Sequence, residues 1–311
     1  MPTIHPRFDL DRWTRQFALE PLQSEVRDWA ARVAASPPDE PEEPSFNSDI
    51  PMVIDGPRGV AVIEQIRSGF GPLGPPIPTD VFVWALGEPP NPAQTKIGGV
   101  PYRPASQPWP TRPDGKPLGF LAQVCFAESR DLASMPGGLL RKPRSLPGDC
   151  LLIFAPGDYL VDWDDDEPGS LTFEWHTLGI TDLVQAKDIP PPPMQLSPAH
   201  AQIHRTADYP RPDRDHPVYS LYSGRDACIF KGSKIGGVPA WQQGAASLSG
   251  HHLCTLGSLN PGDERFPLLN VPESPSGKPS LDDHLLMLAD VGLLYIFIDA
   301  KGALHWTVQG G

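Results

Sequence analysis

The sequence predicts an α+β protein, a β-rich mixed-sheet domain built from two similar halves by internal duplication and preceded by short N-terminal helices. Two features of the composition and one repeat lead to this prediction. The 311 residues include 41 Pro and 29 Gly without any period, which favours many rigid turns and few long helices. Short segments rich in aliphatic and aromatic residues lie between these turns, as in strands. A motif of six residues occurs twice.

Helical periodicity is confined to the N-terminal part of the chain. Apolar residues recur at steps of three and four between residues 8 and 35, and a second short helix is expected over residues 57–69. Residues 36–51 between them hold prolines and acids but no base, which is typical of an extended linker. Residues 1–79 are therefore assigned to helices and an acidic, proline-rich linker.

Strand-like segments begin after this region. Each is rich in β-formers and is bounded by turn residues. The expected strands are 81–84, 120–124, 150–154, 171–175, 218–222, 252–256, 293–298 and 304–308. Residues 299–302 read as the turn of a hairpin that joins the last two.

The repeated motif divides the strand-rich region in two. Lys96-Ile-Gly-Gly-Val-Pro101 recurs as Lys234-Ile-Gly-Gly-Val-Pro239, and a tryptophan follows each copy. Residues 80–189 and 190–311 are thus two β-rich repeats, which we expect to form one compact domain with a pseudo-twofold axis. The motif lacks the spacing of a phosphate-binding loop, so a structural turn is favoured over a ligand-contacting one. The candidate residues of the repeat loops are Lys96, Gly98, Gly99, Pro101, Trp109, Lys234, Gly236, Gly237, Pro239 and Trp241.

The charge balance restricts the partners. The formal net charge is −13, from 38 acids and 25 bases, which argues against direct binding of nucleic acid or an anionic membrane and permits a basic protein partner. The four cysteines form no C-x-x-C pair, which fits a reducing compartment. No signal peptide and no apolar run of membrane-spanning length is recognised, so we expect a cytoplasmic protein.

One segment carries much of the negative charge. Residues 156–190 hold nine acids and one lysine, so 9 − 1 = 8 net negative charges lie there. A solvated loop and a calcium loop are alternatives, although the glycine of an EF-hand loop is missing. A tryptophan among acids favours a partner-binding patch. Its candidate residues are Tyr159, Asp162, Trp163, Asp164, Asp165, Asp166, Glu167 and Trp175.

No constellation of catalytic or metal-binding residues stands out. His251 and His252 are adjacent and would face opposite sides of a strand, while His200 and His204 read as part of a surface turn. Asp282-Asp283-His284 reads as a cap or turn, and Cys150 as a core residue. The sequence therefore predicts no catalytic residue, no metal and no cofactor, and we expect a protein that is not an enzyme.

Several stretches resemble the YwqG-like family, a bacterial domain of unknown function. They are the two copies of the repeated motif, Trp109-Pro110, and the segments 115–124, 147–154 and 288–298. Before Gly292 the chain reads Leu-Ala-Asp, where the family has Trp-Gly-Asp or Gly-Asp. The resemblance covers about residues 80–311 and implies a sheet-rich, duplicated domain without assigned catalytic residues. Some members resemble antidotes to bacterial antagonism toxins.

Two functions follow as expectations. The first is an immunity (antitoxin) protein that inhibits a cognate toxin, a basic nuclease effector of a contact-dependent or type VI secretion system, in bacterial competition. The second is a small-molecule or peptide binding module that uses the cleft between the two repeats. A scaffold that docks through its N-terminal helices is a third, weaker reading.

Overall fold

The computed structural model describes residues 8–16, 24, 27–28, 31, 35, 56–70, 73–133, 135, 146–157, 171–191, 196–210, 228–259, 285–289 and 292–310. Two α-helices have defined bounds, α1 (Leu10–Gln16) and α3 (Gly56–Phe70), and single helical residues are described between 24 and 35. Two 3-10 turns, η1 (Ala127–Ala133) and η3 (Ala186–Asp188), lie in the strand-rich region. Within these residues no helix is long and apolar enough to cross a membrane.

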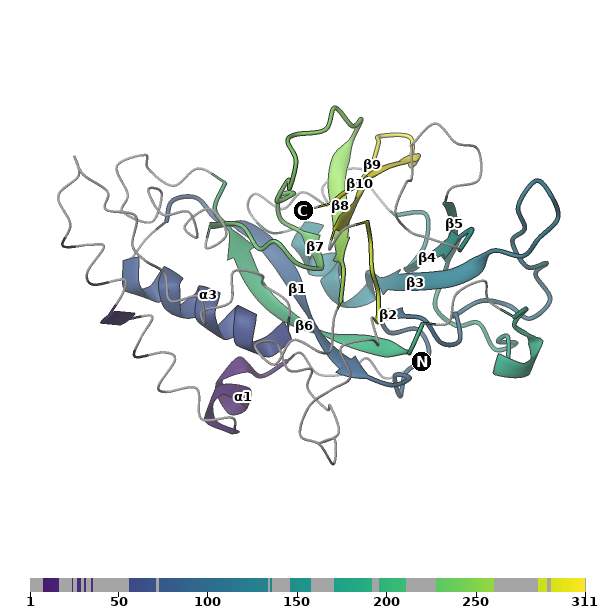
Figure 1. The fold of residues 1–311 in the computed structure, drawn as a ribbon, viewed down its shortest axis with the longest axis horizontal. Helices are drawn as coiled ribbons and strands as arrows, with labels where there is room; N and C mark the ends of the chain where they lie inside the picture. Colours follow the sequence, from purple (N-terminus) through teal and green to yellow (C-terminus); the bar gives the residue numbers. More distant parts are fainter. Residues whose placement is uncertain are drawn as a thin grey trace.

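A single curled sheet of ten strands dominates the molecule (Figure 1). All neighbouring strands pair antiparallel, in the order β10-β9-β8-β7-β1-β6-β2-β3-β4-β5. The strands are β1 (Ile77–Leu86), β2 (Lys96–Ile97), β3 (Gly119–Cys125), β4 (Cys150–Ala155), β5 (Thr172–His176), β6 (Ala199–Asp208), β7 (Lys234–Gly236), β8 (His251–Gly257), β9 (Leu293–Ile298) and β10 (Leu304–Gln309).

The expected α+β class with a mixed sheet is wrong. The protein is mostly β, its sheet is antiparallel throughout the described pairs, and its helices are short. The physical reason lies in how the sheet is covered. Helix α3 lies against the central strands only, whereas loops between the strands cover the outer face of both ends (Figure 1). At both ends of the sheet, the cover is therefore supplied by loops and not by a layer of helices.

The strand order is symmetric about the central pair of β1 and β6. These strands align over ten residue pairs, from Ile77 opposite Asp208 to Leu86 opposite Ala199. On one side β1 pairs with β7, and on the other β6 pairs with β2. The first strand of each half therefore completes the sheet of the other half, an exchange that joins the two sets of strands.

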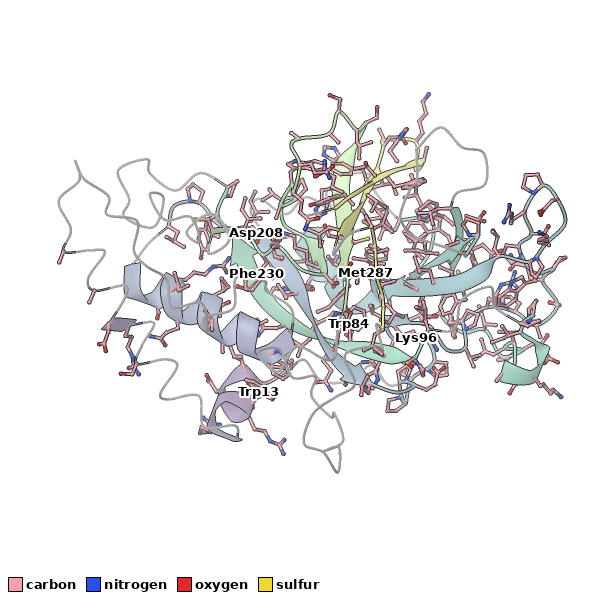
Figure 2. All side chains as sticks on the ribbon, viewed as in Figure 1. Trp13, Trp84, Lys96, Asp208, Phe230 and Met287 are labelled. Atoms are coloured by element: carbon pink, nitrogen blue, oxygen red, sulfur yellow. The ribbon has the colours of Figure 1, made fainter. Side chains whose placement is uncertain are left out.

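One apolar cluster fills the concave face of the sheet. It includes Phe82 and Trp84 of β1, Leu151 of β4 and Ile296 of β9, so strands of both halves contribute to it. Trp84 lies near the middle of the molecule (Figure 2). Trp175 on β5 and Trp306 on β10, the two end strands, pack against the same cluster because the sheet curls. Burial of this shared face holds the halves together.

The sequence located most strands. Seven of the expected segments fall within or overlap β1, β3, β4, β5, β8, β9 and β10, and these are confirmed, as is the helix over 57–69. The expected strand 218–222 lies outside the described residues. The first strand of the second half is instead β6, which the sequence reading had treated as a turn.

Candidate functional site

The first copy of the repeated motif builds a buried corner beside β1. Lys96 on β2 is 1% exposed, and its Nζ lies 2.9 Å from Oε2 of Glu88, which follows β1. Oε1 of Glu88 accepts a hydrogen bond of 2.7 Å from the backbone N–H of Val100. One carboxylate thus ties the motif's lysine and its loop to the end of β1. Burial lowers the pKa of Lys96, and Glu88 opposes that shift.

The second copy repeats this arrangement at the end of β6. Nζ of Lys234 lies 2.7 Å from Oδ2 of Asp208, and neither side chain is exposed. The same Oδ2 accepts the backbone N–H of Val238 at 2.9 Å, as Glu88 accepts Val100. Lys234 also donates to the carbonyls of Phe230 and Val238. Asp208 and Phe230 are close together near one end of the central pair (Figure 2).

The paired glycines allow each loop to approach its carboxylate. Gly99 has φ +70° and Gly237 has φ +63°, in the left-handed region that favours glycine. A Cβ at Gly99 would meet the Glu88 carboxylate, and a Cβ at Gly237 would meet the Asp208 carboxylate. The lysine, the glycines and the following turn therefore serve the fold at both places, and nothing in this geometry leaves the motif open for a ligand.

The two tryptophans that follow the motif lie on the convex face of the sheet. The indole N–H of Trp109 donates to the carbonyl of Leu118 at 2.7 Å, and its ring packs edge-on against Phe154 of β4. The ring of Trp241 lies 4.6 Å from that of Tyr295 and stacks on Phe297 of β9. Each tryptophan therefore covers its own half, and the structure does not bring them together in a shared cleft.

Trp175 is the described member of the expected partner-binding patch. Its ring centre lies 5.6 Å from that of Phe126, and the side chain is half-buried against the concave core. Tyr159, Asp162, Trp163, Asp164, Asp165, Asp166 and Glu167 lie outside the described residues, between β4 and β5 in the sequence. Trp175 therefore has a packing role, and it lies near the end of β5, whereas the acidic segment precedes the first residue of that strand, Thr172.

A buried ionic network that the sequence reading missed fixes β5. Arg103 is 1% exposed and donates to both oxygens of Glu174 on β5, at 3.1 and 3.2 Å. The same guanidinium donates to the carbonyls of Gln107 and Pro108 and lies over the Trp109 ring. Arg103 lies two residues after the motif, but Glu174 lies 71 residues away from it, so no local pattern indicates the pair.

The histidines considered for a metal are separated by the fold. His251 is exposed and His252 is buried, because adjacent strand residues face opposite sides. His200 and His204 lie on β6, where Nδ1 of His200 is 2.9 Å from the Gly87 carbonyl and Nε2 of His204 is 3.5 Å from Glu64. In the part of the chain that the structure describes, no three His, Cys, Asp or Glu side chains could hold a metal ion. Asp282-Asp283-His284 lies outside that part.

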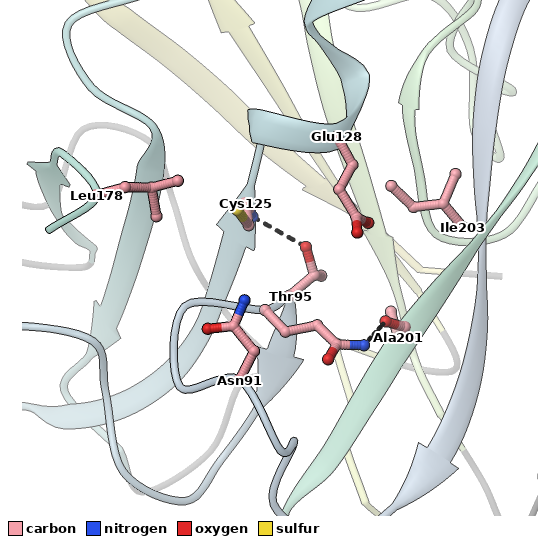
Figure 3. A pocket seen from close by; sticks show the side chains of 8 residues that line it. Asn91, Thr95, Cys125, Glu128, Leu178, Ala201 and Ile203 are labelled. Atoms are coloured by element: carbon pink, nitrogen blue, oxygen red, sulfur yellow. Dashed lines mark hydrogen bonds between the residues drawn. The ribbon is translucent and has the colours of Figure 1, made fainter. Parts of the chain in front are cut away.

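A small cavity lies where the two halves meet (Figure 3). Its volume is about 10 Å³, room for about one water molecule. Gln94 donates to the carbonyl of Ala201 at 2.6 Å, while its Oε1 has no partner, and Thr95 accepts the N–H of Cys125 at 2.9 Å. The cavity is lined by Asn91, Gln94, Thr95, Cys125, Glu128, Leu178, Ala201 and Ile203.

Comparison with known proteins gives a match between part of the first half of the chain and a family model. No curated protein matches the chain. Residues 95–141 match the family model described as a domain of unknown function, DUF1963. The matched segment is well under half of the chain, and it contains the first motif, Trp109, β3 and η1. The chain therefore carries, in its first half, a segment similar to a domain family whose function is not known.

Proposed function

We propose that this protein is an immunity protein of the YwqG-like kind, which binds and inhibits a cognate bacterial antagonism toxin. The toxin is a basic protein, a nuclease effector of a contact-dependent or type VI secretion system. The antidote covers the toxin's active site or substrate groove and mimics the toxin's anionic substrate. This inhibition requires no catalysis by the antidote. The protein acts in the cytoplasm, where such a toxin would meet nucleic acid.

The observation that carries the proposal is the distribution of charge between interior and surface. Among the described residues, four cationic side chains are buried but only two anionic ones. They are Arg67, Lys96, Arg103 and Lys234, against Asp80 and Asp208. Burial therefore removes more positive than negative charge from the surface of a chain whose formal net charge is already −13. Among the described residues, 4 − 2 = 2 more cations than anions are buried, which makes the described surface more acidic than the composition alone would.

Such a surface suits a nuclease as partner. Proteins that act on nucleic acids carry basic grooves that neutralise phosphates. An acidic antidote is attracted to such a groove over several ångströms, which raises the association rate. The segment 158–167, with six acids and two aromatic residues, supplies the anionic groups and the anchors that a tight interface needs.

Expression of the neighbouring genes tests the proposal directly. Each gene product encoded beside this protein is expressed in a bacterial host, alone and together with this chain. We expect one neighbour to stop growth and to be relieved by this protein through a stable complex. If none of the toxic neighbours is relieved, or if relief occurs without a complex, the proposal is wrong.

Charge reversal then tests the role of the acidic segment. The variant Asp164→Lys/Asp165→Lys should associate with the toxin at least about tenfold more slowly at low salt, because electrostatic steering is weakened. Stopped-flow or surface-based kinetics at several salt concentrations measure this rate. The control is Asp182→Lys/Asp188→Lys, which replaces two exposed acids outside segment 158–167 and changes the formal net charge equally, from −13 to −9. Equal rates for both variants would show that only net charge matters.

The second expectation, a ligand site in the cleft between the repeats, has no supporting observation among the residues that the structure describes. Apolar side chains of both halves fill the concave face where such a cleft was expected. The cavity at the junction holds about 10 Å³, whereas sites for small organic ligands measure about 300 to 1,000 Å³. The geometry therefore favours binding through an outer surface.

A further inference from the structure

Two cysteines face each other across β3 and β4. The register places Cys125 directly opposite Cys150. The neighbouring pair is hydrogen bonded, because the N–H of Phe126 donates to the carbonyl of Asp149 at 2.8 Å. Hydrogen-bonded and non-bonded pairs alternate in an antiparallel ladder, so Cys125 and Cys150 form a non-bonded pair. The N–H of Cys125 accordingly points the other way, to Thr95.

This position allows a disulfide without movement of the backbone. The Cα atoms of a non-bonded pair are about 4.5 Å apart and their side chains lie close together. Disulfides span Cα distances of about 4.4 to 6.8 Å, so the pair falls at the short end of the permitted range. A bond formed there is under some strain, which makes it easier to reduce than an ordinary structural disulfide.

One of the two cysteines borders the cavity of Figure 3. Cys125 lines it and is 8% exposed, whereas Cys150 is fully buried and does not line it. The Cys150 thiol lies 3.5 Å from the Ala93 carbonyl and within hydrogen-bonding reach of Cys125. A reagent close to the size of water can reach Cys125, while a bulky one is excluded by the surrounding side chains.

The surroundings also favour Cys125 as the thiolate. A hydrogen bond from Cys150 lowers the pKa of Cys125, and burial opposes that shift in part. The pKa of Cys150 is raised by the same contact and by burial. The directions of the two shifts favour Cys125 over Cys150 as the thiolate.

The fold itself does not require cysteines at this place. The corresponding pair in the second half is Gly257 opposite Leu293, at the same end of the equivalent strands β8 and β9. Both halves form the same ladder, and only the first carries two thiols. The other cysteines, Cys228 and Cys254, are buried on different elements.

We propose that Cys125 and Cys150 form a redox site that hydrogen peroxide, or another hydroperoxide of similar size, converts reversibly into a β3–β4 disulfide. In the first step the Cys125 thiolate attacks one peroxide oxygen, the O–O bond breaks, and Cys125 becomes a sulfenic acid as hydroxide leaves. In the second step Cys150 attacks that sulfur, and its proton leaves with the hydroxyl as water. The peroxide is reduced by two electrons, and the two thiols are oxidised to one disulfide.

Thiol counting on the folded, full-length chain tests this site. The protein is exposed to hydrogen peroxide, quenched and unfolded in excess N-ethylmaleimide, and weighed by mass spectrometry. We expect two maleimides instead of four, since the chain has four cysteines, and a peptide map that links Cys125 to Cys150. Dithiothreitol added during unfolding should restore four. The melting temperature should rise on oxidation and return to its first value once the reduced chain is refolded, because the link restrains the unfolded chain. Oxidised glutathione at equal concentration should leave four thiols.

Cysteine variants test which thiol is oxidised in the first step and which thiol attacks in the second. Cys150→Ala should accumulate a sulfenic acid at Cys125 that dimedone traps when the oxidised chain is unfolded in its presence, whereas Cys125→Ala should give no dimedone adduct at Cys150 under the same treatment. Cys228→Ala is the matched control and should still form the disulfide. The peptide map of the unmodified chain decides the matter even if a variant fails to fold. Four free thiols after peroxide, a link between other cysteines, or a link between two chains would overturn the proposal.

Discussion

His252 occupies in the second half the place that Phe120 occupies in the first. Phe120 lies one residue before the irregularity of β3 and packs on Phe154, and His252 lies one residue before the same irregularity of β8 and packs edge-on against Phe297. Burial lowers the pKa of His252 to about 3, and Lys234 adds to the effect. The imidazole is therefore neutral, at a position where the first half has the phenyl ring of Phe120.

This histidine should make folding sensitive to mild acid. Its folded pKa of about 3 lies below the ordinary value of 6.5, so the unfolded chain binds one more proton between these limits. No effect is expected above pH 6.5, and the free energy of unfolding should fall as the pH drops. Between pH 6.5 and 5 the loss is about 2 kcal/mol. His252→Phe should remove this loss, as measured by urea unfolding at both pH values.

The control for that measurement is the neighbouring histidine. His251 is exposed, so His251→Ala removes a histidine while leaving the buried one in place. Its unfolding free energy should keep the acid-dependent fall. If His252→Phe and the unmodified protein lose equal stability between pH 6.5 and 5, the buried imidazole is not the source.

At the scale of elements, short-range sequence patterns predict the strands that are rich in strong β-formers but do not predict the others. Strands β4 and β9 are runs of aliphatic and aromatic residues, and the sequence located them. Strand β6 has Ala199, Ala201 and Ile203 on its core side and polar residues between them, and this weak alternation was read as a turn. Its polar side chains are accommodated by pairing, since Arg205 binds Asp80 and Asp131, both distant in sequence.

Short-range patterns are equally limited for the candidate site, because they reveal the repeated motif but not its distant partners. Its recurrence indicated two equivalent loops, and the glycines indicated positive φ. The sequence could not show that each lysine pairs with a carboxylate at the end of a strand, because Glu88 precedes Lys96 by eight residues and Asp208 precedes Lys234 by 26. Nor do the two acids share a local pattern, since one is a glutamate outside β1 and the other is an aspartate within β6.

The two ion pairs, Lys234–Asp208 and Lys96–Glu88, should differ in their contribution to the free energy of unfolding. Lys234→Met leaves Asp208 fully buried without its counter-ion, and such a loss costs about 3 to 5 kcal/mol. Lys96→Met leaves Glu88, which is 41% exposed and can be hydrated, so about 1 kcal/mol or less is expected. Urea unfolding of both variants measures the difference.

A second substitution separates charge from packing at the Lys234 corner. Asp208→Asn in the Lys234→Met background removes the unpaired charge and keeps one of the two oxygens, so one of the N–H groups of Phe230 and Val238 retains its acceptor. Part of the lost stability should return. Equal losses for Lys96→Met and Lys234→Met would contradict the role assigned to burial of the carboxylate.

At the scale of the whole molecule, the exchange of first strands makes each half incomplete. Strand β1 is encoded with the first half but lies between β6 and β7, and β6 is encoded with the second half but lies between β1 and β2. A separate first half would lose the ten-residue pairing along β1, and its core cluster would lose the side chains of β8 and β9. The duplication therefore describes how the sequence is organised, while folding requires both halves together.

Cutting the chain between the halves tests this dependence. Fragments 1–190 and 191–311 should each be unfolded or aggregated when expressed alone, because the exposed strand edges and apolar face have no cover. Expressed together, with a tag on one of them, they should purify as a complex with the circular dichroism of the intact chain. A protease site placed in the proline run 190–193 provides the converse experiment, since the folded protein should stay associated after cleavage until denaturant is added. A fragment that is monomeric and gives dispersed amide resonances by itself would show that the exchange of β1 and β6 is not what joins the halves.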